Sequence, residues 1–137
     1  MAIIYVARSK TLSDWGASVG ISKHLFKVGT AEGDGKQAIV ELNEQVRAGA
    51  DDWKLVKADD AEELTETDVL ERLAAKVTVV DPNYYPRIKR EPGIFRIKIK
   101  DVENSMIVAR AIANVESLNF TVKPPDIGTY LIKNARR

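Results

Sequence analysis

Six basic side chains gather within fourteen residues of the C-terminal half, interrupted by one acid, Glu91: Arg87, Lys89, Arg90, Arg96, Lys98 and Lys100. Tyr84 and Tyr85 stand beside them. Cations that contact phosphates release counterions, and exposed aromatic rings stack on unpaired bases. This combination predicts a nucleic-acid-binding surface, with DNA as the expected ligand. A well-hydrated edge of a sheet is the alternative interpretation.

The formal net charge of +1 conceals an uneven distribution along the chain. Residues 51–71 hold nine acids against two lysines, a local balance of −7. Residues 72–137 hold thirteen Lys or Arg and six Asp or Glu, a balance of +7. Such asymmetry can direct a polyanion toward one face and divalent cations toward another, although solvated faces of unrelated elements would give the same distribution.

The residue types restrict the metal chemistry that the chain can support. It has no Cys and a single His, His24. A disulfide framework, a thiolate zinc site and an imidazole cage are therefore excluded. An oxygen-liganded ion such as Mg²⁺ is the cofactor that this composition allows.

Two strand-like segments near the N-terminus carry a paired motif. Ile3-Ile4-Tyr5 closes the first and Lys27-Val28-Gly29 closes the second, and a helix-forming stretch follows. In this order they resemble the paired signatures of the GIY-YIG nucleases and their phage-type relatives, and the similarity extends over residues 1–100. The resemblance implies a small, mainly antiparallel sheet flanked by helices, in which the two motif strands are neighbours and line one cleft.

The resemblance gives catalytic roles to two residues of these strands. Tyr5 matches the tyrosine of the first motif. Lys27-Val28-Gly29 occupies the position of the second motif and is similar to its Lys-Ile-Gly form, common among the phage-type members, in which Lys27 replaces the second tyrosine. A phenol with a pKa of ~10 is a poor base at neutral pH unless a nearby cation lowers that value. We expect Lys27 to supply this charge to Tyr5; a core tyrosine with a satisfied hydroxyl is the alternative.

The helix positions of the resemblance are less direct. The family's arginine position falls on Ala38, so Lys36 or Arg47 is the nearest cationic substitute for a phosphate clamp. Glu71 is the best match for the metal-binding glutamate, with Glu66 as the runner-up. The resemblance thus implies an endonuclease that hydrolyses a phosphodiester with Mg²⁺ or Mn²⁺, or a binding-only member that has lost this activity.

The elements that must position these residues follow from hydrophobic periodicity. Residues 2–7 and 25–28 are apolar and rich in β-formers, which predicts two strands, the first of them buried and central. Residues 9–23 contain two Gly and four Ser, which predicts a long loop with at most a turn of helix. From Lys36 to Val46 the apolar spacing predicts a helix, and the alternation in residues 53–57 predicts a third strand.

The acidic segment predicts a second helix, capped at its N-terminus by Asp59 or Asp60. The β-branched run 77–80 then favours a strand. The alternation of apolar and basic side chains in residues 95–100 predicts a half-buried antiparallel strand with a basic outer face.

A third helix is expected over residues 103–116, and a strand over residues 119–122. Pro124 and Pro125 are expected to block its continuation, and residues 130–132 are expected to return as a short edge strand.

The whole chain, residues 1–137, is expected to form one α+β domain, because 137 residues with 45% hydrophobic content suffice for a single core. Residues 101–137 would extend the GIY-YIG-like part. No apolar run approaches the ~18 residues of a membrane span, and the first eight residues lack a signal-peptide pattern, so a cytoplasmic location is expected. A second hypothesis is a non-enzymatic interaction or assembly subunit that pairs an exposed edge strand near Tyr130 with a partner.

Overall fold

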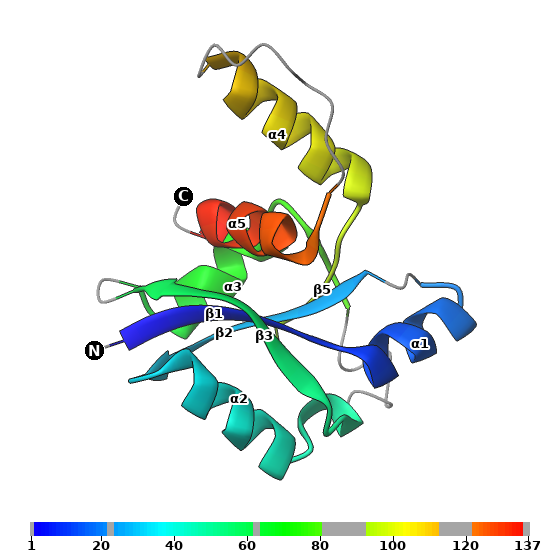
Figure 1. Ribbon diagram of the computed structural model, residues 1–137, viewed down its shortest axis with the longest axis vertical. Helices are drawn as coiled ribbons and strands as arrows, with labels where there is room; N and C mark the ends of the chain where they lie inside the picture. Colours follow the sequence, from blue (N-terminus) through cyan, green and yellow to red (C-terminus); the bar gives the residue numbers. More distant parts are fainter. Residues whose placement is uncertain (1, 22–23, 62–63, 81–92, 113–121, 136–137) are drawn as a thin grey trace.

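The computed structural model describes residues 2–21, 24–61, 64–80, 93–112 and 122–135. Within these ranges it forms a five-stranded antiparallel sheet with the order β3-β1-β2-β5-β4 (Figure 1). The strands are β1 (Ala2–Ser9), β2 (Leu25–Glu32), β3 (Trp53–Asp60), β4 (Thr78–Val79) and β5 (Ile94–Arg96). The helices are α1 (Lys10–Ser18), α2 (Gly35–Glu44), α3 (Glu66–Ala74), α4 (Ile99–Ile112) and α5 (Pro124–Ala135), with a short 3-10 turn at Arg47–Gly49. The predicted α+β class is confirmed.

The central strand β1 is covered on both faces, which explains its unbroken apolar run. Ile3, Tyr5 and Ala7 pack with the buried side chains of α2, whereas Ile4 and Val6 pack with those of α3 and α5. Figure 1 shows α2 on one side of the sheet and α3 and α5 on the other. Because fully burying a Val or Ile side chain contributes about 1.5–3 kcal/mol, this strand anchors both halves of the core.

The two motif strands are hydrogen-bonded neighbours, as expected. β1 and β2 pair antiparallel with Tyr5 opposite Gly29 and Ala7 opposite Lys27, so Tyr5 and Lys27 share one face of the sheet. On its other side β2 pairs with β5 only from Leu25 to Lys27. Beyond that point, in the described part of the chain, no strand covers the second edge of β2.

The prediction of a long loop over residues 9–23 was wrong, because residues 10–18 form α1. Ser9 caps this helix by accepting a hydrogen bond from the Leu12 N–H at 3.1 Å. Its hydroxyl also donates to the Asp52 carboxylate, which accepts two more bonds from Thr11, at 3.0 Å from N and 2.9 Å from Oγ1. Asp52 lies just before β3, so its hydrogen bonds connect the start of α1 to the start of β3. The prediction failed because it considered only the Gly and Ser residues of the segment itself, and Asp52 lies about forty residues away in the chain.

The helix cap predicted at Asp59 or Asp60 was also wrong. Both residues belong to β3, which runs three residues further than expected. Helix α3 begins at Glu66 instead, and the Thr65 hydroxyl accepts a bond from the Asp68 N–H at 3.1 Å. Thr65 and Asp68 are spaced as in a capping box, a signal that the acidic run around them obscured.

The basic strand predicted over residues 95–100 is shorter than expected. β5 ends at Arg96, and α4 begins at Ile99, so Lys98 and Lys100 do not lie on a sheet face. Ile94 and Phe95 are both buried, one in each half of the core. The strand is therefore covered on both faces and has no basic outer face.

The edge strand predicted at residues 130–132 was wrong, because these residues lie within α5. Pro124 is the first residue of this helix, where a missing N–H costs nothing, so the Pro-Pro pair starts a helix rather than blocking a strand. The Lys123 N–H donates to the Asp126 carboxylate at 2.9 Å. The interaction-subunit hypothesis thereby loses the edge strand near Tyr130 on which it rested.

In the described ranges, no helix combines the length and the apolar character that a membrane crossing requires. Most of the strand expected at residues 119–122 lies outside the described residues.

Replacing Asp52 with Asn should lower the free energy of unfolding by about 1–3 kcal/mol at neutral pH, since hydrogen bonds to a charged group are lost. Burial raises the pKa of Asp52, but bonds from Ser9 and Thr11 outweigh it and hold the pKa below its ordinary value of 3.8. A depressed pKa means that the carboxylate contributes stability above about pH 4, and that this contribution is lost as the pH falls through the folded-state value. Urea unfolding at several pH values measures this.

The exposed neighbour Asp51 provides a matched control, because Asp51→Asn should change stability by no more than about 0.5 kcal/mol. A wild-type protein and an Asp52→Asn variant with parallel pH profiles below pH ~4 would contradict the role assigned to this carboxylate.

Candidate functional site

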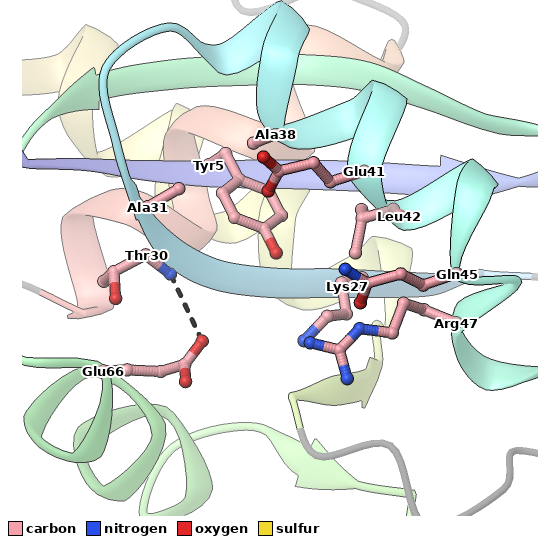
Figure 2. Close-up of a pocket in the computed structure, with 10 residues that line it drawn as sticks. All are labelled: Tyr5, Lys27, Thr30, Ala31, Ala38, Glu41, Leu42, Gln45, Arg47 and Glu66. Carbon is pink, nitrogen blue, oxygen red and sulfur yellow. Dashed lines mark hydrogen bonds between the residues drawn. The ribbon is translucent and has the colours of Figure 1, made fainter.

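A pocket of about 200 Å³ opens between α2, the second half of β2 and the start of α3 (Figure 2). Ten residues line it: Tyr5 from β1; Lys27, Thr30 and Ala31 from β2; Ala38, Glu41 and Leu42 from α2; Gln45 from the C-cap of α2; Arg47 from the following turn; and Glu66 from α3. Two cations, two carboxylates and a phenol thus share one small volume. This mixture is unlike an apolar ligand pocket and suits a charged, hydrated ligand.

The hydroxyl of Tyr5 and the carboxylate of Glu66 meet at Gly29. A Cβ atom at position 29 would lie 2.7 Å from the Tyr5 hydroxyl oxygen and 3.0 Å from Glu66 Oε1. The sum of these distances is an upper limit on the separation of the two oxygens. Glycine is required here because any side chain would occupy the space that the phenol and the carboxylate share.

Glu66 reaches this point because the edge of β2 is open there. The Val28 N–H donates to Gly93 O at 2.8 Å, away from β1, and the Thr30 N–H has the same direction two residues later. No strand accepts it in the described part of the chain, and Glu66 Oε1 does so at 3.4 Å (Figure 2). Glu66 is the first residue of α3, so its side chain enters the pocket from the N-terminal end of that helix.

The two cations of the pocket come from different elements. Lys27 is 2% exposed, and its Nζ lies near Gly93, where an added Cβ would be 3.2 Å away. Arg47 is exposed and enters from the turn after α2. In Figure 2 both side chains extend toward the same side of the pocket, across from Tyr5 and Glu66.

The backbone around Arg47 is strained. Val46 and Ala48 have φ values of 49° and 55°, in the left-handed region that non-glycine residues, and β-branched ones above all, rarely adopt. Ala48 is buried, and the Trp53 indole N–H donates to Arg47 O at 3.0 Å. Asn43 adds two bonds to the backbone of Trp53. These contacts impose the turn, and the turn presents Arg47 to the pocket.

The pocket brings together three of the four predicted catalytic residues, Tyr5, Lys27 and Arg47. Lys36 is exposed on the first turn of α2 and does not line the pocket. Of the two glutamates, the runner-up Glu66 lines it, whereas Glu71 is exposed further along α3.

Three of the six predicted nucleic-acid-binding residues lie in the part of the chain that the structure describes. Arg96 is half-buried on β5, and Lys98 and Lys100 are exposed at the start of α4; none of them lines this pocket. The remaining three, Arg87, Lys89 and Arg90, lie outside the described residues, as do Tyr84 and Tyr85.

Sequence reasoning missed Thr30, Glu41 and Gln45. Glu41 on α2 and Gln45 at its C-cap are four residues apart, so they lie on the same side as Ala38, and this spacing was a usable signal. Thr30 contributes through its backbone N–H, which no residue-type pattern reveals.

The pocket can accommodate a magnesium ion only in its water-rich form. No cluster of three or more His, Cys, Asp or Glu side chains with the geometry of a metal site occurs among the described residues. Magnesium is often held by one or two carboxylates together with water and substrate phosphates. Glu66 fits that role, because its carboxylate lies beside the Tyr5 hydroxyl and within the pocket.

No protein-family model, curated protein or solved structure matches this chain. The function of the pocket therefore has to follow from its own chemistry.

Replacing Gly29 with Ala should cost about 1–3 kcal/mol of stability, because the new methyl group overlaps the Tyr5 hydroxyl. In a Tyr5→Phe background the cost should fall by at least about 0.5 kcal/mol, since the contacting oxygen is gone. Urea unfolding of the two single variants and the double variant measures this coupling. Purely additive effects would mean that the hydroxyl does not lie against Gly29.

Proposed function

We propose that this chain is a nucleic-acid-binding protein of the GIY-YIG type that hydrolyses phosphodiester bonds in DNA with the help of a divalent cation. The observation that carries the proposal is the convergence of the Tyr5 hydroxyl and the Glu66 carboxylate on Gly29. Lys27 and Arg47 line the same pocket and add the positive charge that a phosphate needs. The paired tripeptides of β1 and β2 supply the resemblance.

The proposed roles follow from charge and position. Arg47 binds the phosphate, because its planar guanidinium can donate two parallel bonds to phosphate oxygens. Tyr5, acting as the phenolate, accepts the proton of the attacking water, and Lys27 adds positive charge to the same pocket. The water oxygen forms a bond to phosphorus as the bond to the leaving oxygen breaks, and solvent protonates the leaving oxygen.

Glu66 is the residue that would hold the ion. Bound magnesium or manganese supplies polarisation of the phosphate and stabilisation of the leaving oxygen. The hydrogen bond from the Thr30 N–H holds the carboxylate at the pocket wall. The proposal therefore selects Glu66 over Glu71 as the metal ligand.

Replacing Glu66 with Gln should lower cleavage of DNA in Mg²⁺ or Mn²⁺ by about a hundredfold or more, and Tyr5→Phe should have an effect of similar size. The matched control is Glu71→Gln, an exposed glutamate of the same helix, which should retain the wild-type rate. A gel assay of plasmid and single-stranded substrates measures the rates. Loss of activity in Glu71→Gln alone would contradict the assignment, and an inactive wild-type protein would refute the hydrolytic part of the proposal.

Binding should depend on salt and on Arg47. Each phosphate contact to duplex DNA weakens affinity about 3.5-fold between 50 and 200 mM salt, so several contacts weaken it tenfold or more. Replacing Arg47 with Gln should reduce the slope of the logarithm of affinity against the logarithm of salt concentration by about one unit. Fluorescence anisotropy with a labelled oligonucleotide measures both quantities.

Lys36→Gln serves as the control for charge, because Lys36 is an exposed cation of α2 that does not line the pocket. It should leave the salt dependence nearly unchanged. No binding of the wild-type protein at either salt concentration would refute the whole proposal.

A further inference from the structure

A second polar pocket, of about 100 Å³, lies beyond β5 and away from the first. Its polar lining comes from five places in the fold: Lys76 after α3, Thr78 on β4, Arg96 on β5, Lys98 and Asp101 around the start of α4, and Tyr130 on α5. The two pockets share no lining residue: Glu66 begins α3 at the first, and Lys76 follows the end of this nine-residue helix at the second. They are distinct sites.

The charge of this pocket is predominantly positive. Three cations, Lys76, Arg96 and Lys98, face one carboxylate, Asp101. The Lys76 ammonium donates to Asn134 O at 2.9 Å, which fixes it against α5. Within the described ranges, the side chains of Arg96 and Lys98 make no hydrogen bond or ion pair, so their donors remain available to a ligand.

The first turn of α4 adds to this positive potential. The N–H groups of Asp101 and Val102 donate to Lys98 O, at 3.0 and 3.4 Å, which places Lys98 directly before the first turn of α4. Because Lys98 and Asp101 line the pocket, the positive end of a fourteen-residue helix opens onto it. The N-terminus of a helix favours anions, and here it reinforces side-chain cations.

Two hydroxyl groups complete the lining. Burial, with a contribution from the negative charge of Asp101, raises the pKa of Tyr130 above its ordinary value of 10.0. The Tyr130 hydroxyl therefore keeps its proton at neutral pH and can donate to an anion. Thr78 lies opposite Arg96 in the β4–β5 register and offers a second hydroxyl.

We propose that this pocket binds a phosphate group, held by Arg96 and Lys98 with Tyr130 and Thr78 as hydrogen-bond donors. Its volume of about 100 Å³ is about three times the ~30 Å³ that a water molecule occupies, which leaves room for a tetrahedral anion. The guanidinium of Arg96 matches two oxygens of such a group. The phosphate can come from a nucleic-acid backbone or from a small phosphate ester.

An NMR titration with inorganic phosphate, at constant ionic strength maintained with sodium chloride, tests the proposal. The backbone amides of Thr78, Arg96 and Asp101 should shift saturably with phosphate. The double variant Arg96→Gln, Lys98→Gln should bind phosphate at least about tenfold more weakly. Amides that do not shift, or a double variant with wild-type affinity, would overturn the proposal.

Two single variants separate this site from general surface charge. Asp101→Asn removes the competing negative charge and should tighten phosphate binding about threefold or more. Lys54→Gln alters an exposed lysine of β3 that lines neither pocket and should leave the affinity unchanged. Weaker binding in Asp101→Asn would contradict the assigned electrostatics.

A single-stranded oligonucleotide distinguishes the two sources of the phosphate. If it shifts the same amides at least about tenfold more tightly than inorganic phosphate does, the ligand is a nucleic acid that also contacts the surrounding surface. Equal affinity assigns the site to a small phosphate ester. The readout concerns amides of the second pocket, so it does not depend on hydrolysis at the first.

Discussion

The antiparallel pairing of β1 with β2, in the register that sets Tyr5 opposite Gly29, determines which side chains can meet in this protein. A slip of one residue would turn Tyr5 toward α3 and α5 and remove it from the pocket. The apolar residues on both faces of β1 prevent this slip, because it would exchange the two halves of the core. The same register places the open edge of β2 within reach of Glu66, so the sheet pairing arranges the phenol and the carboxylate together.

The position of Arg47 depends on a different balance. The left-handed backbone at Val46 and Ala48 is unfavourable for L residues, by roughly 1–2 kcal/mol each, and persists because burial of Ala48 and the hydrogen bonds of Trp53 and Asn43 offset it. Strain of this kind is found most often where a side chain must be presented to a ligand. The turn after α2 is thus locally strained at Val46 and Ala48, and Arg47 between them lines the pocket.

Much of the fold could be predicted from the sequence, and the failures have physical causes. Apolar periodicity identified β1, β2, β3 and α2, because burial on a fixed face leaves a fixed spacing. It missed α1, whose start is stabilised by Asp52, about forty residues away in the chain. It also misread Asp59 and Asp60 as a cap and residues 130–132 as a strand, since short polar or apolar runs take the conformation that their tertiary partners impose.

For the site, the sequence indicated Tyr5 and Lys27, whose placement follows from strand pairing. It named Arg47 without selecting it over Lys36, and it preferred Glu71 to Glu66. The position of Arg47 depends on where α2 ends, and that of Glu66 on where α3 begins. Such helix boundaries are set by caps and strained turns, which are hard to predict from sequence. The contribution of the Thr30 N–H was not predictable, because it arises from the point at which β5 stops pairing with β2.

Helix α3 runs from the first polar pocket, where it begins at Glu66, toward the second, where Lys76 follows its last turn. Adding or removing one residue within it would rotate everything beyond that point by about 100° and advance it by ~1.5 Å. Glu66 and Lys76 could not then both keep their present directions. The length of this helix therefore fixes how the two pockets are oriented relative to each other. A change of length would alter that orientation even if every side chain lining both pockets were retained.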